Sequence, residues 1–367
     1  MKYVDEYRDP QAARDLIEQI HRLSDSMDRH FKFMEVCGGH THTIYRHGLE
    51  RLMPEQVEFV HGPGCPVCVI PRGRVDDAIW LAHQPGVIFT TFGDMMRVPG
   101  TKKQSLLGGG ADGTDTRFVY SPLDAVKIAR DNPESTVVFF AIGFETTAPA
   151  TAAAITVADR LGLTNFFVFC NHVLINPPVA AILSVANVQL DALIGPGHVA
   201  TVVGSRHFDF VPRDFHIPIV MTGFEPLDIL ASVTMLLRQY SEGRCEVENQ
   251  YARVVRPEGN AEALRLLSDV FTVKSTFEWR GLGSIPDSGY AIAEKYQRFD
   301  AELHFDVPGI VVPDHPACQC GLVLTGQLKP WECKVFGTGC TPQNPIGTCM
   351  VSPEGACAAY YNFGRLP

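Results

Sequence analysis

Seven short apolar runs, each ending in a glycine or polar turn, constrain the fold of this chain more than any other feature. They are rich in Val, Ile and Phe, and apolar and polar residues do not alternate cleanly within them. This pattern is typical of parallel strands that are buried on both faces. The runs lie at residues 31–36, 57–60, 86–92, 136–143, 165–170, 190–195 and 217–223.

Helical stretches lie between these apolar runs. Two clear examples are "PLDAVKIARDN" at 122–132 and "PLDILASVTMLLRQY" at 226–240. Strands that alternate with helices predict an α/β, Rossmann-like architecture. A chain of 367 residues is long enough for two or three domains of ordinary size.

A weak internal sequence similarity suggests that the α/β part is duplicated. "HGPGC" at 61–65 resembles "IGPGH" at 194–198, and Cys37 and Cys170 end two apolar runs at the same separation. We therefore expect two Rossmann-like parallel-sheet domains related by internal duplication. Their predicted bounds are 31–133, with Cys37 and the Cys65/Cys68 pair, and 134–270.

The sequence changes character after about residue 270. One helix is expected within 278–302, and the tail that follows is rich in Cys, Pro and Gly with little strand signal. Such a segment has to be ordered by a cofactor rather than by a large apolar core. We predict a Cys-rich iron–sulfur domain at 271–367, packed with an N-terminal helix within 1–30.

Charge and hydropathy exclude several classes of function. The net charge is −10 and no basic stripe occurs, which argues against nucleic-acid binding. The N-terminal sequence "MKYVDEYRDPQAARDLIEQIH" has no apolar core typical of a secretory signal. No stretch approaches 18 uninterrupted apolar residues, so no membrane partner is expected. We expect a cytoplasmic protein.

The C-terminal cysteines give the strongest chemical signal. Four thiolates suffice for a [4Fe–4S] cluster or a zinc site. The spacing here is irregular, contains glycines and lacks C-x2-C knuckles, so it favours the cluster, with a zinc-stapled tail as the alternative. Two thiols left beside a cluster could form a redox-active disulfide. The six residues are Cys318, Cys320, Cys333, Cys340, Cys349 and Cys357.

A second cysteine group lies near the N-terminus, in "CGGHTH" at 37–42 and "GPGCPVC" at 62–68. The carboxyl ends of neighbouring parallel strands should bring Cys37, Cys65 and Cys68 to one crevice. Soft thiolates with nearby imidazoles suit iron or zinc. The C-x-x-C spacing is equally typical of thiol–disulfide enzymes, and a purely structural pair is also possible.

Three other side chains near strand ends are candidates. His40 and His42 could assist a metal site, although turn histidines more often serve as hydrogen-bonding residues. Glu145 lies in "GFETTAPAT" at 143–151, where Thr146 or Thr147 could cap a helix whose N-terminus attracts an anion. The glycine-rich stretch at 105–118 lacks the Walker Lys-Ser/Thr, so we expect a flexible loop there.

Together, "CGGHTH", "GPGCPVC", "GFETTAPAT" and the six-cysteine tail resemble the HypD family of [NiFe]-hydrogenase maturation proteins. The resemblance runs from Cys37 to Cys357. It implies two Rossmann-like domains and a third domain with a [4Fe–4S] cluster bound by the pattern Cys-x14-Cys-x6-Cys-x16-Cys. Cys320 and Cys349 then resemble the cluster-adjacent disulfide of ferredoxin–thioredoxin reductase. The pattern selects as ligands Cys318, Cys333, Cys340 and Cys357.

The resemblance also implies a function, namely assembly of the Fe(CN)2CO unit with a HypC-type chaperone and a HypE-type cyanide donor. Cys37, Cys65 and Cys68 match the family's essential cysteines, with Cys37 expected to hold iron and His40 and His42 to orient its ligands. A second hypothesis is an iron–sulfur-dependent thiol–disulfide reductase. It needs Cys65 and Cys68 but no iron at Cys37.

Overall fold

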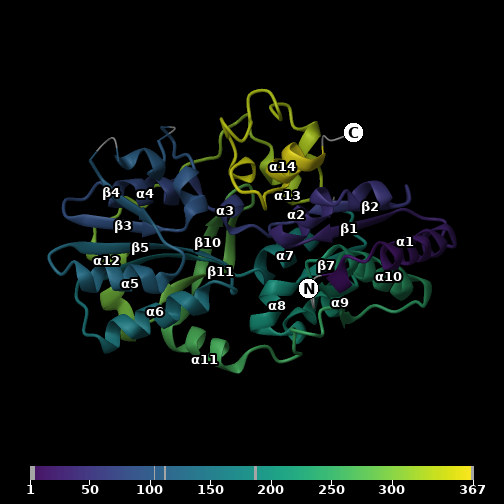
Figure 1. Cartoon of the computed structure of the whole chain (residues 1–367), viewed down its shortest axis with the longest axis horizontal. Coiled ribbons are helices and arrows are strands. Elements are labelled where there is room, and N and C mark those ends of the chain that lie inside the picture. Colours follow the sequence, from purple (N-terminus) through teal and green to yellow (C-terminus); the bar gives the residue numbers. More distant parts are fainter. Residues whose placement is uncertain (1–4, 103, 111–112, 186–187, 365–367) are drawn as a thin grey trace.

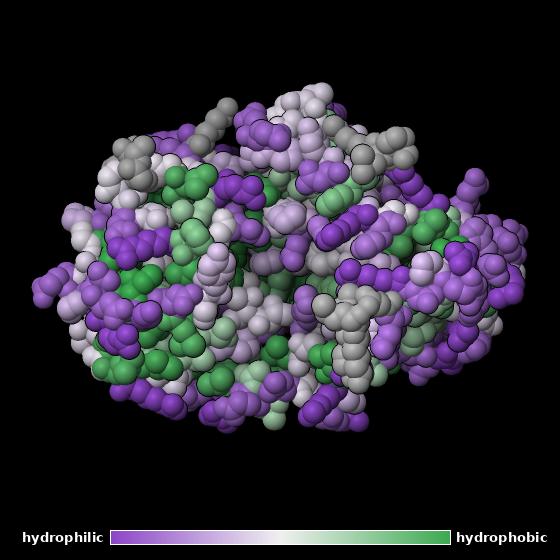
Figure 2. Space-filling model, in the orientation of Figure 1, coloured by the Kyte–Doolittle hydropathy of each residue, from purple (hydrophilic) through white to green (hydrophobic). Residues whose placement is uncertain are grey.

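The computed structural model describes residues 5–364 except 103, 111–112 and 186–187. Two α/β lobes lie side by side, and the Cys-rich C-terminal region sits over their junction (Figure 1). Hydrophilic residues spread over both lobes, and the surface is hollowed near the middle (Figure 2). Within the described ranges, no helix has the length and apolar character needed to cross a bilayer.

Sheet A forms the core of one lobe, and all its strand pairs are parallel. In spatial order its strands are β2 (Val57–His61), β1 (Phe31–Glu35), β7 (Ala192–Pro196), β8 (Ile219–Thr222) and β9 (Val247–Asn249). On one face, Phe31 and Phe33 pack with Ile20 of α1 (Pro10–Asp25) and Leu230 of α10 (Pro226–Ser241). The other helices of this lobe are α2 (Gly38–Arg46), α7 (Asn176–Leu183), α8 (Gly197–Val203) and α9 (Phe210–Phe215).

Sheet B forms the core of the other lobe and is also parallel. Its spatial order is β4 (Asp115–Phe118), β3 (Val87–Thr91), β5 (Thr136–Gly143) and β6 (Phe166–His172). Apolar helical residues cover one face from α5 (Pro122–Asp131), α6 (Ala148–Arg160) and α11 (Ala261–Val270). Helix α4 (Arg72–Ala82) packs on the opposite face, where Val75 and Ala78 share a core with Phe89. Burial on both faces explains why these strands are continuously apolar.

The seven apolar runs all form strands, which confirms the α/β class with two parallel sheets. The strand β4 lies in the stretch predicted as a flexible loop, of which residues 111–112 are outside the described residues. Its polar, partly exposed sequence explains why the apolar pattern missed it.

The predicted boundary at 133/134 needs correction. It falls inside sheet B, and sheet A combines β1 and β2 with strands that follow sheet B in the chain. The two "GPG" turns follow β2 and β7, which flank β1 in the same sheet. Cys37 follows β1 in sheet A, whereas Cys170 lies within β6 in sheet B. The internal sequence similarity therefore reflects a turn that is repeated within one sheet, not one turn in each lobe.

The region 271–304 also differs from the prediction of a single helix. It begins with an antiparallel hairpin, β10 (Phe271–Trp279) and β11 (Gly283–Ile292), which runs between the lobes (Figure 1). The short helix α12 (Ala301–His304) follows. Phe271, Ile292 and Phe299 belong to the core of sheet B, so the Cys-rich region proper comprises 305–364. The N-terminal helix α1 was expected to pack with the Cys-rich region, but it packs on α10. Residues 1–4 and 365–367, which belong to the predicted domains, lie outside the described residues.

Candidate thiol and metal site

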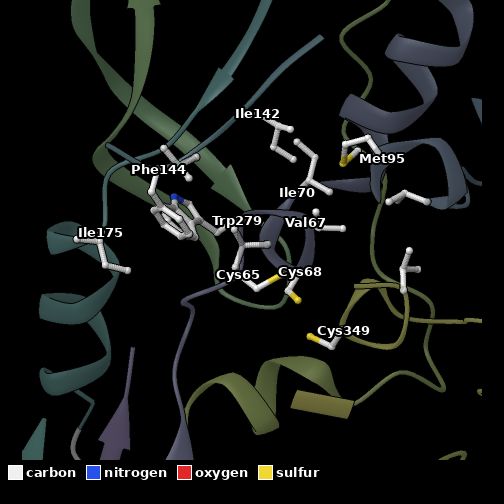
Figure 3. Packing of buried hydrophobic residues seen from close by; sticks show 14 of the residues in the cluster. Cys65, Val67, Cys68, Ile70, Met95, Ile142, Phe144, Ile175, Trp279 and Cys349 are labelled. Carbon is white, nitrogen blue, oxygen red and sulfur yellow. The ribbon is translucent and has the colours of Figure 1, made fainter. Parts of the chain in front are cut away.

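Cys65 and Cys68 lie in a buried turn at the carboxyl end of β2. Cys65 directly precedes the one-turn helix α3 (Pro66–Val69), and Pro66 at the first helical position fixes the backbone angle that this start requires. The amide of Cys68 donates to the carbonyl of Cys65 at 3.1 Å. Figure 3 shows the Cys65 sulfur beside that of Cys68, and the Cys68 sulfur directed at that of Cys349, which comes from the Cys-rich region.

The thiol contacts continue beyond this turn. Cys68 is in side-chain hydrogen-bonding contact with Cys65 and Cys349, Cys349 also with Cys320, and Cys320 with Cys318. We call these five residues the thiol chain. It runs from the C-x-x-C turn into the Cys-rich region, where α13 (Cys320–Leu324) begins at Cys320.

Two hydrogen bonds fix the geometry of the thiol chain. The Thr348 hydroxyl donates to the carbonyl of Cys68 at 2.7 Å and thereby places Cys349 over α3. The Arg280 amide, in the turn of the β10–β11 hairpin, donates to the carbonyl of Val69 at 2.8 Å. Three segments that are distant in sequence therefore meet at the C-x-x-C turn.

The acidity of the thiols differs along the chain. Burial, followed by the contacts with Cys349 and Cys65, raises the pKa of Cys68 well above its ordinary value. Hydrogen bonds from Cys320 and Cys68 lower the pKa of Cys349. Cys349 therefore forms a thiolate more readily than Cys68, and the thiolate is the form that attacks a disulfide.

All six C-terminal cysteines line one cavity, together with apolar side chains such as Val323, Phe336 and Met350. The amide of Ile346 donates to the sulfur of Cys340 at 3.3 Å. At Gly347 a side chain would collide with the sulfur of Cys318, because a Cβ atom there would be only 2.6 Å away. Thiolate donors, an amide directed at sulfur and apolar walls are what an iron–sulfur cluster requires.

The cavity fits the predicted ligand set in its donor chemistry. Within the ranges that the structure describes, no three His, Cys, Asp or Glu side chains are arranged to hold a metal ion. The four predicted cluster ligands, Cys318, Cys333, Cys340 and Cys357, all line the cavity.

Cys37 lies at the carboxyl end of β1, the strand next to β2, as predicted. Gly38 donates its amide to the carbonyl of Gly64 at 3.1 Å, and a Cβ atom on Gly64 would be 2.4 Å from the Cα of Cys37. Cys37 and the C-x-x-C turn therefore pack backbone to backbone. Burial, and then the nearby carboxylate of Glu354, raise the pKa of Cys37, so its thiol is neutral in the isolated chain.

Sequence reasoning missed a buried hydrogen-bonded chain next to Cys37. Glu35 is fully buried, and its carboxylate accepts the Cys37 amide at 3.0 Å and the Thr41 hydroxyl. The same carboxylate is 2.7 Å from Nδ1 of His61, whose Nε2 is 2.6 Å from the Tyr45 hydroxyl. The sequence signal that could have revealed it is an acidic residue at the end of the buried run "FKFME".

The two candidate histidines contact different segments. His40 is fully buried, stacks on Phe224 and has its Nε2 3.1 Å from the carbonyl of Thr222. Burial lowers the pKa of His40, so it is neutral. His42 is half-buried, with its Nδ1 3.4 Å from the carbonyl of Pro353 in the Cys-rich region. The expected joint role of these histidines at one metal stays a prediction.

Glu145 occupies a separate buried position after β5. Its Oε1 accepts the amide of Ile175 at 3.1 Å, while its Oε2 has no partner among the described atoms. Burial raises the pKa of Glu145 to about 7. Thr147 precedes α6, but its side chain makes no capping hydrogen bond, so the capping prediction is wrong for Thr147. The preceding residue, Phe144, packs on Trp279, and both rings belong to the buried cluster that includes Cys65 and Cys68 (Figure 3).

These features define an α/β protein with two interleaved parallel sheets, in which a Cys-rich C-terminal region delivers thiols to a C-x-x-C turn. A family model described as "HypD: Hydrogenase formation hypA family" matches residues 11–364. The chain belongs to the HypD family.

Curated relatives match along the whole chain. Hydrogenase maturation factor HypD2 of Bradyrhizobium diazoefficiens is 50% identical over 100% of this chain and 98% of its own length. The HypD factor of Azotobacter vinelandii is 51% identical over 100% of this chain and 97% of its own length. That of Escherichia coli K12 is 50% identical over 99% and 98% of the two chains.

Proposed function

We propose that this chain is the scaffold and redox protein on which the Fe(CN)2CO unit of [NiFe] hydrogenases is assembled. It would hold iron together with a HypC-type chaperone and accept cyanide from a HypE-type donor. Membership in the HypD family places the chain in hydrogenase maturation. The observation that carries the finer proposal is the thiol chain, which links the cysteine cavity to the turn beside Cys37.

The cysteine cavity supplies the ligands for a resident [4Fe–4S] cluster. When bound, such a cluster supplies electrons one at a time to a neighbouring disulfide. Cys320 and Cys349 are then left free, and their sulfurs are in contact with each other. The ligands in this proposal are Cys318, Cys333, Cys340 and Cys357.

The thiol chain can pass reducing equivalents by disulfide exchange. The Cys349 thiolate attacks the Cys68 sulfur of an oxidised Cys65–Cys68 pair, so a Cys68–Cys349 bond forms and Cys65 leaves as a thiolate that takes up a proton. Cys320 then loses its proton and attacks Cys349, which releases Cys68 as a thiolate that takes up a proton and closes a Cys320–Cys349 disulfide. Two electrons have moved to the C-x-x-C turn, and of the two protons taken up there, one balances the proton lost by Cys320 and the other comes from solvent, because Cys349 reacts as a thiolate.

The reduced turn provides what cyanide release requires. Cleavage of the sulfur–carbon bond of a thiocyanate consumes two electrons and one proton and yields a thiol and cyanide. The Cys65–Cys68 dithiol supplies two electrons and two protons as it becomes a disulfide. One proton goes to the donor's sulfur, and the other is released when cyanide binds iron as an anion.

Cys37 is the proposed protein ligand for the iron that receives this cyanide. Its thiol is neutral in the isolated chain, so iron binding would release its proton. Iron with cyanide and carbonyl ligands favours soft donors, and a thiolate is such a donor. The backbone contacts between Cys37 and Gly64 keep this ligand beside the redox-active turn.

Infrared spectroscopy of the anaerobic complex with the chaperone tests the proposal. The wild-type complex should show cyanide and carbonyl stretching bands. Cys37→Ala should abolish them, whereas Cys245→Ala, which removes an exposed cysteine elsewhere, should retain them. Bands that persist in Cys37→Ala would overturn the assignment of Cys37 as iron ligand.

The alternative, a thiol–disulfide reductase without an iron-carrier role, is favoured by one observation. The thiol chain uses five cysteines and does not need Cys37. Metal analysis after anaerobic purification with the chaperone separates the two functions. An iron content that accounts for the cluster alone supports the reductase. Additional iron that is present in the wild type and lost in Cys37→Ala supports the scaffold.

A further inference from the structure

A cleft of about 390 Å³ lies outside the thiol and iron site. Its walls come from the start of α4, from Arg97, Pro99 and Gly100, and from residues 343–346 of the Cys-rich region. A water molecule occupies about 30 Å³ of liquid volume, so the cleft is large enough for a small-molecule ligand. We call it the basic cleft, because its lining includes Arg72 and Arg97.

The two guanidinium groups have only neutral contacts. Arg72 donates to the carbonyls of Pro313 and Thr101 at 3.3 and 3.5 Å, and Arg97 donates to the carbonyl of Val351 at 3.4 Å. Within the part of the chain that the structure describes, neither has an ion-pair partner, and no acidic residue lines the cleft. Two like charges on one cleft are unexpected in a protein of net charge −10.

Two acidic side chains beside the cleft already have hydrogen-bond partners. Asp76 accepts the amide of Thr101 at 2.7 Å as well as the Thr101 hydroxyl. Asp314 is 3.0 Å from the Arg280 guanidinium and accepts the amide of Gly281 at 2.9 Å. Among the described residues neither carboxylate pairs with Arg72 or Arg97, so both guanidinium groups are available to an anionic ligand.

Neutral donors complete the lining. Nδ1 of His315 accepts the amide of Ala317 at 3.2 Å, which places the proton of a neutral imidazole on Nε2, where it is available for donation. The side chains of Gln343 and Asn344 add amide donors to the same cleft. Guanidinium groups bind phosphate through paired hydrogen bonds, and neutral donors can satisfy the remaining oxygens.

We propose that the basic cleft binds the phosphoryl group of free phosphate or of a phosphorylated small molecule. This goes beyond the proposed function, which requires no such ligand. The bound group would join α4 and Arg97, on the lobe of sheet B, to residues 343–346, which follow Cys340 of the cysteine cavity. Occupancy of the cleft would thereby stiffen one wall of that cavity.

Calorimetric titration of the anaerobically prepared full chain tests this site with two probes, inorganic phosphate and adenosine 5′-diphosphate. We expect one saturable site per chain. Arg72→Gln and Arg97→Gln should each weaken binding about 10-fold or more, because each removes a charge-assisted hydrogen-bond donor. Arg160→Gln, which removes an exposed guanidinium on α6, should bind as the wild type does.

The two probes distinguish the sources of the phosphoryl group. Tighter binding of the diphosphate supports a phosphorylated small molecule, and equal or weaker binding supports free phosphate. The proposal is overturned if neither probe saturates, or if the Arg72→Gln/Arg97→Gln double variant binds like the wild type while its circular dichroism is unchanged. Neither outcome depends on iron or on Cys37, so the proposed function is tested separately.

Discussion

The hydroxyl of Thr348 donates a 2.7 Å hydrogen bond to the carbonyl of Cys68, across 280 residues of sequence. Both groups are buried, and the residue that follows Thr348 is Cys349. This bond therefore helps to hold Cys349 at the C-x-x-C turn. The predictions below begin with it.

Replacement of Thr348 by Val should destabilise the docking of the Cys-rich region. The Cys68 carbonyl would lose its buried side-chain donor, a loss that costs about 1–3 kcal/mol. Chemical denaturation of the anaerobic protein measures the change in the free energy of unfolding. Thr348→Ser keeps the hydroxyl and should recover most of the difference, and equal losses in the two variants would contradict this role of the hydrogen bond.

The contact between Cys68 and Cys349 predicts a specific mixed disulfide. In the double variant Cys65→Ser/Cys320→Ser, the exchange partners on either side are removed, so mild oxidation should trap a Cys68–Cys349 bond. Peptide mapping by mass spectrometry identifies that linkage. Cys65→Ser/Cys349→Ala is the matched control and should leave Cys68 unlinked. A main product that joins Cys68 to Cys170 or Cys245 would refute the order of the thiol chain.

Gly64 should not tolerate a side chain. A Cβ atom there would be 2.3 Å from the backbone nitrogen of Cys37, and backbone atoms cannot move aside as a flexible side chain can. Gly64→Ala should lower the free energy of unfolding by about 1–3 kcal/mol or more. Gly93→Ala, which meets no atom within 4 Å, should change it by about 0.5 kcal/mol at most. Thermal unfolding of both variants tests this packing. Similar unfolding midpoints for the two variants would contradict it.

The buried carboxyl of Glu145 predicts a pH dependence of stability. Folding raises its pKa from 4.5 to about 7, so the folded state favours the protonated form. The stability contributed by protonated Glu145 is fully present below pH 4.5 and is lost as the pH rises through 7. Glu145→Gln stays neutral, so it should be more stable than the wild type at pH 8, by up to about 3 kcal/mol.

Denaturation of both proteins across pH 4–8 checks this sign. The two stability curves should converge near pH 4, where Glu145 itself is protonated in both the folded and unfolded states. Glu134→Gln, on an exposed turn, serves as the control and should follow the wild-type curve. A constant difference between Glu145→Gln and wild type over this range would mean that burial does not hold the carboxyl protonated.

The apolar runs predicted all seven central strands because burial on both faces leaves a continuous apolar signal. Short or half-exposed strands such as β4 carry no such signal. The placement of Cys37 beside the C-x-x-C turn was also predictable, since β1 and β2 are adjacent parallel strands.

The division of the chain between the sheets was not predictable in this way. Hydropathy marks a strand but does not specify its neighbour, and β1 pairs with β7 on the far side of sheet B in sequence. The contact between Cys68 and Cys349 depends on how a region with little regular structure docks, which spacing alone does not encode. Glu35 is the intermediate case, because its carboxylate ends an apolar run and only the fold supplies His61 and Tyr45 as partners.

The interleaving of the two sheets has a consequence for synthesis on the ribosome. All strands of sheet B lie between β2 and β7, so this sheet can pair while sheet A still consists of two strands, and α11 and the β10–β11 hairpin complete its core later. The segment with Cys37, Cys65 and Cys68 thus emerges early and waits for β7 and β8 before it is enclosed. Nascent chains carry these three thiols uncovered, and translation of the last third of the message closes the site over them.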